Sequence, residues 1–583
     1  MRLEDQNKAV PSVGSALLFR SKALAFQVKR AARGITASDP RRHPVSDALI
    51  DANIIAESRT PLWNDADGSE RVLTLGKIHN LRLAIQRLHG VEVPRGSVFS
   101  FWKQIGRTSR HKGYVAGREL REGCLVASIG GGLCQLSNAL YDAALQAGCE
   151  IVERHAHSKV VPGSLAEIQR DATVFWNYVD LRFLHADDFR IEAELTAESL
   201  VVRFRARTIR RRPVVININA RRSKPITEIN SCTSCDATEC FRHVGNEVKI
   251  TKGHTAFLLD EYWPEFDRYI SNSKQERDLL CVPLDGRKYE KSNYAWTTDG
   301  FGLVKQSRFF ALRRAYESRK SSAHGAARQA AALQSNEKLA ARYATRLAYE
   351  VTHVTVMQNL LPYLWRQGHL TGRTFDVLMT RLPLANLQNR LDTAFQLHPE
   401  SPTLSDFRAN PELVASETAA LARANRIITP HTEIAALFPE KSVLVDWVLP
   451  RVESIVKANK QQPARIVFPA ATLGRKGVYE LREALSGLEV ELALAGPILE
   501  RKDFWKGVRV RQLPRDVDWL ESATAVVLPS FVEHNPRRLL EALARGVPVI
   551  ASEACGLGNV GGVTTVDTHG SSLRDALMTL MGS

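Results

Sequence analysis

The sequence lacks any uninterrupted apolar stretch of about 18 residues, the length that a helix needs to cross a bilayer. Its first 34 residues mix apolar side chains with arginine and lysine, without the compact apolar core of a signal peptide. Only 8 of the 583 residues are cysteine, which is too few for a disulfide scaffold. We therefore expect a cytoplasmic protein whose basic start is either an ordinary surface helix or a peripheral contact with the anionic inner face of the membrane.

Acidic residues are fewer than basic ones, 63 against 79, which gives a formal net charge of +16. This balance favours partners that carry phosphate, such as nucleotides, nucleic acid or an anionic membrane surface. The chain has no basic motif interleaved with aromatic residues, so we expect no specific nucleic-acid binding. The hydrophobic content of 44% and the chain length indicate an ordinary globular protein of three to four domains.

The apolar pattern changes along the chain and predicts a multidomain protein. Residues 190–205 alternate between apolar and polar, which predicts antiparallel strands at the end of an α+β region. Residues 305–350 are rich in Ala, Arg, Lys, Gln and Glu, which predicts a long helix that faces solvent. After Arg465, short apolar strands alternate with helices, which predicts an α/β lobe with a doubly wound parallel sheet and a ligand crevice at the carboxyl ends of its strands. The expected boundaries are a basic segment at 1–60, an α+β domain at 61–215, a cysteine-rich joint at 216–250, a divergent helix-rich first lobe at 251–445 and a second lobe at 446–583.

Two carboxylates and a basic turn characterise the second lobe. Glu533 lies at a predicted strand-to-helix loop, and Glu541 follows eight residues later in the helix, so both can face one cleft. A carboxylate suits a sugar diol, because its oxygens accept hydrogen bonds from both hydroxyls. Upstream, Arg475, Lys476 and Gly477 open a helix directly after another strand, where a diphosphate would sit on a positive helix terminus.

These motifs resemble the second lobe of GT-B glycosyltransferases, in particular the large retaining family whose signature is E-x7-E, and the likeness covers about residues 465–580. The resemblance implies that Glu541 binds the ribose of a nucleotide-sugar donor and that Glu533, the catalytic glutamate, binds the transferred sugar. It also implies that Lys476, with Arg475, neutralises the diphosphate without a bound metal. The alternative is that the two glutamates are a solvated pair on a surface helix.

The chain departs from this family at two places. Ala470 and Ala471 stand where the family often has an arginine, and His534-Asn535-Pro536 replaces the glycine after the first glutamate. The donor chemistry is therefore either altered or lost. In the first lobe, His353 and His431 are either acceptor-site residues or satisfied structural histidines.

A second set of motifs lies in the N-terminal part. Ile129-Gly-Gly-Gly-Leu-Cys-Gln-Leu-Ser places Cys134 at the start of a predicted helix, whose positive terminus favours a thiolate. A predicted strand then leads to His155 and His157, and a further strand is expected to begin with Asp171. This order resembles papain-like and transglutaminase-like active sites by analogy, with either His155 or His157 as the histidine.

These motifs, over residues 70–206, resemble the VanW family, which is named for a protein of vancomycin-resistance clusters and whose molecular activity is unsettled. His157 fits the family pattern better than His155. Two interpretations of the motifs remain. Either Cys134, His157 and Asp171 are catalytic, or Cys134 is a small buried hydrophobe beside a tight glycine turn and Asp171 is a hydrogen-bonding cap.

A cluster of thiols marks the joint between the two halves. Cys232, Cys235, Cys240 and His243 lie within twelve positions and could form the tetrahedral shell of a structural zinc. The alternatives are an iron–sulfur cluster with a fourth ligand such as Cys281, or unliganded thiols.

The sequence therefore predicts a glycosyltransferase that moves a sugar from a nucleotide-sugar donor to a glycan or lipid-linked acceptor of the cell envelope, fused to a VanW-like domain. The envelope acceptor rests on family association. One alternative is a cysteine-dependent hydrolase or transferase that acts through Cys134 and His157, with a C-terminal half that only binds sugar or nucleotide. The other alternative is a non-catalytic scaffold that is associated with the cell envelope.

Overall fold

The computed structural model describes residues 40–63, 71–121, 124–157, 159–160, 164–176, 178–208, 224–225, 253–320, 326–404, 408–452, 464–501, 503–514, 516–568 and 571–582. These residues form two compact units. The N-terminal unit extends to residue 253 and includes 349–352 and 371–373, and the C-terminal unit takes the rest. Most of the predicted basic segment and nearly all of the cysteine-rich joint lie outside the described residues.

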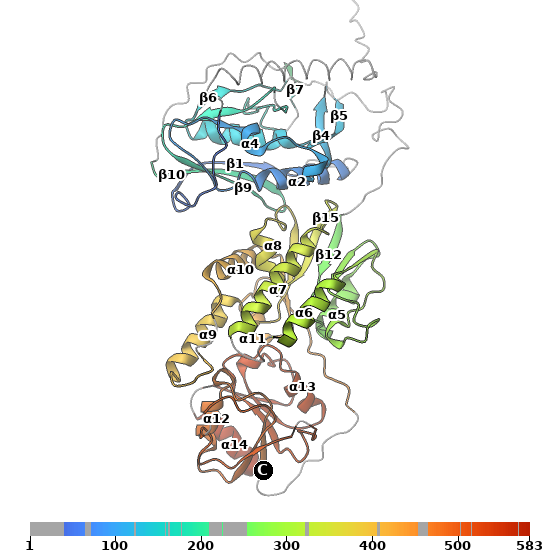
Figure 1. Ribbon diagram of the computed structural model, residues 1–583, viewed down its shortest axis with the longest axis vertical. Helices are drawn as coiled ribbons and strands as arrows, with labels where there is room; N and C mark the ends of the chain where they lie inside the picture. Colours follow the sequence, from blue (N-terminus) through green and yellow to red (C-terminus); the bar gives the residue numbers. More distant parts are fainter. Residues whose placement is uncertain are drawn as a thin grey trace, which may run out of the picture. The chain divides into compact units, whose positions relative to one another are not determined.

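An antiparallel sheet of four strands organises the N-terminal unit, in the order β1 (Asn53–Pro61), β10 (Ser199–Ala206), β9 (Phe189–Leu195) and β2 (Val91–Val93). Strands β9 and β10 confirm the alternation in the sequence, with Ile191 opposite Phe204 on the buried face. Helix α4 packs against β1 and β10 (Figure 1). The fold class of this unit is α+β, as predicted.

The remaining elements of this unit are short strands and helices. They are α2 (Arg71–Ile85), β3 (Phe99–Ser100), α3 (Phe101–Ile105), η1 (Arg110–Lys112), β4 (Ala116–Arg121), β5 (Cys124–Ile129), α4 (Leu133–Gln146), β6 (Glu150–Glu153), β7 (Lys159–Val160), β8 (Arg182–Leu184) and β11 (Lys224–Pro225). Strands β3, β8 and β6 form one small sheet, β4 and β5 a hairpin, and β7 pairs with β11.

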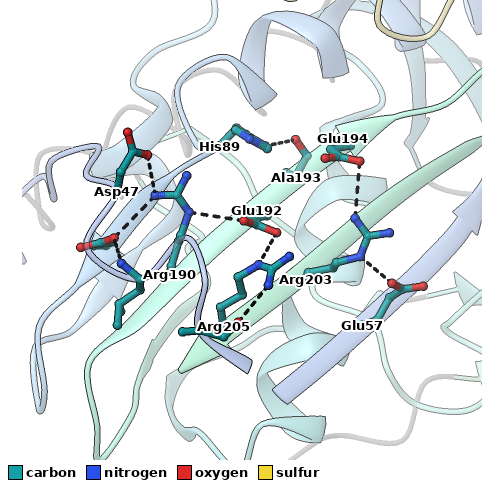
Figure 2. A network of polar contacts seen from close by, with 12 residues as sticks. Asp47, Glu57, His89, Arg190, Glu192, Ala193, Glu194, Arg203 and Arg205 are labelled. Carbon is teal, nitrogen blue, oxygen red and sulfur yellow. Dashed lines mark hydrogen bonds and ion pairs between the residues drawn. The ribbon is translucent and has the colours of Figure 1, made fainter. Parts of the chain in front are cut away.

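The opposite face of the four-stranded sheet carries a ladder of charged side chains, as Figure 2 shows. Glu192 lies between two guanidinium groups, with Oε1 at 3.4 Å from Arg190 and Oε2 at 2.8 Å from Arg205. Arg203 in turn pairs with Glu57 on β1 at 2.6 Å. The side chains of Arg190 and Glu192 are only 4% and 9% exposed, so these two charges are withdrawn from water and depend on their partners.

Two parallel sheets form the C-terminal unit, one in each lobe. The first has seven strands in the order β14 (Leu303–Gln306), β13 (Leu279–Val282), β12 (His254–Leu258), β15 (Val351–Met357), β16 (Thr374–Leu378), β17 (Arg426–Thr429) and β18 (Ser442–Leu444). Strands β12 to β14 pair in parallel, as do β15 to β18. Its helices are α5 (Pro264–Ser273), α6 (Arg308–Lys320), α7 (Ala326–Ala344), α8 (Leu361–Arg366), α9 (Leu384–Leu397), α10 (Pro411–Arg423) and α11 (Thr432–Ala436), with the short turns η3 (Ser292–Tyr294) and η4 (Gln358–Leu360).

The second sheet has six strands, all parallel, in the order β21 (Val510–Gln512), β20 (Val490–Leu494), β19 (Ala464–Phe468), β22 (Ala525–Leu528), β23 (Val549–Ser552) and β24 (Val563–Val566). Every residue of β22 and β23 is buried, as expected for strands covered on both faces. The turns and helices of this lobe are η5 (Gly474–Lys476), α12 (Val478–Leu485), α13 (Arg537–Ala544), η6 (Glu553–Cys555) and α14 (Ser572–Gly582). This confirms the predicted doubly wound sheet.

The helical region 305–350 differs from its prediction. The described residues form two helices, α6 and α7, and α7 is not a solvent-facing helix along its whole length. Leu339, Ala340 and Tyr343 of α7 are buried, and the Tyr343 hydroxyl donates to the carbonyl of Leu259 at 2.9 Å. The alanine-rich composition concealed this contact, because alanine suits a packed helix as well as an exposed one. Among the described residues, no helix combines the length and the apolarity that a membrane span requires.

We expect Arg190→Ala to lower the free energy of opening of strands β9 and β10 by about 3 kcal/mol, because it removes one partner from a buried ion network. Hydrogen–deuterium exchange of peptides that cover residues 189–206 measures this change in the full chain. The matched control is Arg59→Ala, which removes a guanidinium that is 53% exposed in the same sheet and pairs with Glu57. Equal exchange in the two variants would contradict the role of the network.

Candidate functional site

The glycine run before α4 places Cys134 at the start of the helix. Gly132, the N-cap of α4, has φ = 98°, and a Cβ on it would come within 2.2 Å of the Lys77 side chain. A Cβ on Gly131 would come within 2.4 Å of the carbonyl oxygen of Gly117. No side chain fits at either position, so the turn packs closely and Cys134 becomes the second residue of α4, as the sequence predicted.

Two polar residues of α4 hold the segment that follows Asp171. The Ser137 hydroxyl donates to the carbonyl of Ala172 at 2.5 Å, and the amide of Ala172 donates to Asn138 Oδ1 at 2.8 Å. The Cys134 Sγ lies 4.0 Å from the carbonyl oxygen of Val174. These contacts fix Asp171 close to the first turn of α4.

Asp171 does not begin a strand, so this part of the sequence prediction is wrong. Its backbone carbonyl accepts a hydrogen bond from Arg154 Nε at 2.7 Å, and the amide of Thr173 donates to the carbonyl of His155 at 2.7 Å. The backbone groups of this segment bond to the loop after β6 and to α4 instead of to a strand ladder.

The imidazole of His157 is oriented by the buried carboxylate of Asp171. His157 Nδ1 lies 2.8 Å from Asp171 Oδ2, and the backbone amide of His157 donates to the same oxygen at 2.6 Å. Arg154 holds the other carboxylate oxygen at 2.7 Å. The Asp171 side chain is 3% exposed, so the orientation of the imidazole is tightly defined.

Charge favours protonation of His157. Burial alone would lower the pKa of His157, but the hydrogen bond to Asp171 and the contact with Cys134 outweigh it and raise the pKa to about 9. Burial would raise the pKa of Asp171, and its bonds to His157 and Arg154 lower it instead. His155 takes no part, because its side chain is 52% exposed and lies 3.5 Å from Glu153. The structure thus brings Cys134, His157 and Asp171 together.

The candidate donor site lies at the switch point of the second sheet, between β19 and β22, where the strand order reverses. Lys476 follows β19, and Glu533 follows β22. The Lys476 Nζ lies 2.7 Å from Glu533 Oε2 and donates to the carbonyl of Val532 at 2.9 Å. The two predicted halves of the site are therefore in contact.

Gly477 permits this close approach. Its φ is +74°, and a Cβ on it would come within 1.9 Å of the carbonyl oxygen of Pro529. The amide of Phe531 donates to the carbonyl of Arg475 at 3.0 Å. The turn before α12 therefore lies directly against the loop that carries Glu533.

The two glutamates differ in their surroundings. Burial would raise the pKa of Glu533, but Lys476 and the amide of Asn535, which donates to Oε1 at 2.9 Å, outweigh it and lower the pKa. Glu541 lies in α13 and is half-buried. Within the part of the chain that the structure describes, its carboxylate accepts no hydrogen bond, so it is available to a ligand.

Two arginines near this site were missed from the sequence. Arg538 Nη1 donates to the carbonyl of Pro469 at 2.7 Å and to that of Ala495 at 3.2 Å, which places its guanidinium at the carboxyl ends of β19 and β20. This is next to Ala470, where the sequence lacks the arginine that its resemblance to glycosyltransferases led us to expect. Arg381, held by Glu417 at 2.7 Å, adds charge from the first lobe. The sequence did offer a signal for Arg538, because two successive arginines, Arg537 and Arg538, lie between Glu533 and Glu541.

His534, which replaces the expected glycine, is surrounded by positive charge. Its Nε2 is buried and has no hydrogen-bond partner among the described residues. Burial lowers its pKa far below the ordinary range, and the nearby cations Lys476, Arg381 and Arg475 lower it further. A neutral imidazole among cations leaves this position open to an anion.

The two first-lobe histidines make structural contacts. His431 Nε2 lies 3.0 Å from the carbonyl oxygen of Glu533, and the ring is 1% exposed. His353 lies inside β15, with Nδ1 at 2.8 Å from Thr374 Oγ1 and Nε2 at 3.2 Å from Asp376. His353 is therefore away from the carboxyl edge of the sheet, where ligands bind.

The predicted metal ligands Cys232, Cys235, Cys240 and His243 lie outside the described residues. In the described ranges, no group of three or more His, Cys, Asp or Glu side chains is arranged to hold a metal ion. The alternative ligand Cys281 is completely buried in β13, and burial raises the pKa of its thiol to about 12.

A cavity of about 410 Å³ lies elsewhere in the second lobe. Its lining residues are Thr524, Pro548, Ile550, Thr564, Ala576, Thr579 and Leu580. Thr524 and Pro548 precede β22 and β23, so the cavity is at the amino ends of the strands, opposite the candidate donor site.

Comparison with known families agrees with this organisation. Residues 76–205 match the family described as "VanW like protein", and residues 453–561 match the family described as "Glycosyl transferases group 1". The chain therefore carries a VanW-like domain in its N-terminal part and a group 1 glycosyltransferase domain in its C-terminal part.

Two curated proteins are similar to the N-terminal part. The uncharacterized protein YoaR of Bacillus subtilis (strain 168) is 30% identical over 185 residues, which is 31% of this chain and 59% of that protein. The vancomycin B-type resistance protein VanW of Enterococcus faecalis (strain ATCC 700802 / V583) is 28% identical over 153 residues, 25% of this chain and 56% of that protein. The chain thus spans less than two thirds of the length of either relative.

Solved glycosyltransferase structures share distant similarity. The lipopolysaccharide outer core galactosyltransferase WaaB in its apo form has a TM-score of 0.33 and 15% identity, over 56% of this chain and 90% of that chain. The catalytic domain of starch synthase IV from Arabidopsis thaliana has a TM-score of 0.34 and 10% identity, over 57% of this chain and 92% of that chain.

We expect the N-terminal unit to lose stability as the pH rises from about 6.5, the pKa of an unfolded histidine, to about 9, because charged His157 favours the folded state in its pair with Asp171. The contribution is complete below pH 6.5. Thermal unfolding at a series of pH values measures it, with Asp171→Asn as the variant that removes the charge partner. If Asp171→Asn lost as much stability between pH 6.5 and 9 as the unsubstituted chain, the His157–Asp171 pair would not be the cause of the pH dependence.

Proposed function

We propose that the C-terminal unit transfers a sugar, with retention of configuration, from a nucleotide-sugar donor to a glycan or lipid-linked acceptor of the cell envelope. The observation that carries this proposal is the contact between Lys476 and Glu533 across the switch point of the second sheet. Ligands of doubly wound sheets bind at this place, outside the carboxyl ends of the strands. The match of residues 453–561 to group 1 glycosyltransferases supports it.

The donor's diphosphate would lie over Lys476, Arg475 and the start of α12. The first amides of a helix have no acceptor within the helix and point toward its amino end, so they add donors for phosphate oxygens. Arg475 lies within electrostatic reach of Glu533, and the structure gives its guanidinium no ion pair among the described residues. The cationic side chains neutralise the charge that develops on the diphosphate as the glycosidic bond breaks.

The sugar and the ribose would be held by the two glutamates. Glu533 is the catalytic glutamate of the proposal and contacts the transferred sugar, while Lys476 and the amide of Asn535 keep it ionised. The carboxylate of Glu541 would accept hydrogen bonds from both hydroxyls of the ribose diol. Arg538 supplies from α13 the guanidinium that the loop at Ala470 lacks.

The acceptor class rests on the N-terminal domain. One relative of that domain is a vancomycin B-type resistance protein, and the proposed envelope acceptor rests on this family association alone. We place the reaction in the cytoplasm, at the inner face of the membrane where the acceptor is lipid-linked. The net charge of +16 favours contact with such an anionic surface.

We expect calorimetric titration with UDP, GDP and TDP to show micromolar binding of one nucleotide. Lys476→Ala and Glu541→Ala should each weaken it by about 10- to 100-fold, because each removes a charge-assisted hydrogen bond. The control variants Lys506→Ala and Glu521→Ala change exposed residues of the same lobe and should leave the affinity unchanged. If the unsubstituted chain binds none of the three nucleotides, the donor site is refuted.

Arg538→Ala should weaken the binding of that nucleoside diphosphate by about tenfold and leave the binding of the corresponding nucleoside unchanged, because a guanidinium recognises the phosphate. Titration of both ligands into the variant and the unsubstituted chain gives the comparison. Equal weakening for nucleoside and diphosphate would place Arg538 at the base or the ribose instead.

A further inference from the structure

Helix α6 of the first lobe presents three large apolar side chains to solvent. Phe309 is 82% exposed, Leu312 67% and Tyr316 59%. We propose that this apolar face of α6, together with the loop 287–291, is a docking surface for an anionic lipid membrane. The contact goes beyond the proposed sugar transfer, because no residue of the donor site takes part in it.

The first argument is that the three side chains share one face of the helix. Their spacing of three and four residues places them on successive turns of the same side of α6. Single apolar residues are ordinary on a protein surface, whereas a group of them on one helix face marks a contact surface.

The second argument is that α6 is held with this face outward. The helix lies beside α7 (Figure 1), and Phe310 and Ala311 on its other side are buried. Arg314 Nη1 lies 2.5 Å from Asp260 Oδ1, and the Asp260 side chain is 1% exposed. These contacts fix the rotation of α6 about its axis, so turning Phe309 inward would break a buried ion pair.

The third argument is the charge on both sides of the apolar face. Helix α6 has the sequence RFFALRRAYESRK, with five basic residues and one acidic residue. At about 100° of rotation per residue, Arg308 lies on one side of the apolar face and Arg313 on the other. Both are exposed. Arg313 pairs with Glu317 at 2.7 Å, and such an exposed pair holds it only weakly.

The loop 287–291 extends this basic surface. Its sequence is Arg-Lys-Tyr-Glu-Lys, and all five residues are exposed. Arg308 and Lys288 lie over the ring of Tyr289, at 5.4 Å and 5.9 Å from its centroid. The loop and the start of α6 therefore form one surface, to which Tyr289 adds a further aromatic ring.

This combination fits an anionic lipid surface. The apolar and aromatic side chains of an interfacial helix enter the boundary between headgroups and acyl chains, while arginine and lysine beside them contact lipid phosphates. A second copy of the chain fits less well, because its basic residues would meet those of the first copy.

The test is co-sedimentation of the full chain with vesicles of phosphatidylcholine and phosphatidylglycerol in equal amounts, and with vesicles of phosphatidylcholine alone. We expect binding to the mixed vesicles that weakens as salt is added, and much weaker binding to the neutral vesicles. Phe309→Ala with Leu312→Ala should weaken binding to the mixed vesicles at least about tenfold, because less apolar surface leaves water while alanine preserves the helix.

The matched control is Phe395→Ala with Leu397→Ala, which removes the same two residue types from α9 of the same lobe. These side chains are 36% and 48% exposed, and their removal should leave vesicle binding unchanged. Arg308→Gln with Arg313→Gln should weaken binding to the mixed vesicles at least about fivefold and reduce its dependence on salt. Hydrogen exchange with the mixed vesicles should show protection of residues 308–320 and none of residues 384–397.

Full vesicle binding by Phe309→Ala with Leu312→Ala would overturn the proposal, as would the absence of binding by the unsubstituted chain. Equal binding to both kinds of vesicle would overturn the role of anionic charge. Light scattering without lipid tests the second copy. A dimer that becomes a monomer in the α6 variant, and not in the α9 control, would mean that self-association covers this face and would also overturn the proposal.

Discussion

The ion pair between Lys476 and Glu533 joins the two sides of the second sheet at the point where its strand order reverses, and the candidate donor site depends on it. One partner follows β19 and the other follows β22, so the pair forms only when the sheet is assembled. It keeps Glu533 ionised although the side chain is largely buried. Around it gather the other charged groups of the site, with Arg475 on the same turn and Arg538 on α13.

The two candidate sites share one construction, although they lie in different units. In each, a glycine with positive φ caps a helix at its amino end, at Gly132 before α4 and at Gly477 before α12. In each, a Cβ on that glycine would collide with a neighbouring residue, so the turn packs more closely than any other residue allows. The amino end of the helix then lies beside Cys134 in one unit and beside the proposed diphosphate position in the other.

Sequence patterns predicted the regular elements well and the irregular ones poorly. The alternation at 190–205 and the apolar runs after residue 465 became strands, because the period of burial is a local property of the chain. Asp171 was wrongly assigned to a strand, since its backbone bonds to Arg154 and its neighbour Ala172 bonds to α4. The role of α7 in the core was missed for a related reason: an alanine-rich pattern does not reveal which partner covers the helix.

By itself the sequence determined the two-part organisation, the chemical types of the candidate residues and the helix starts after Gly132 and Gly477, because glycine runs and apolar periods act within a few residues. The sequence preferred His157 to His155, but only the tertiary structure decided that its imidazole contacts Asp171 and that Arg538 lies beside Pro469, next to Ala470. These pairings join residues far apart in the chain, or choose between neighbours with the same chemistry. They depend on hydrogen bonds between elements, which no local pattern encodes.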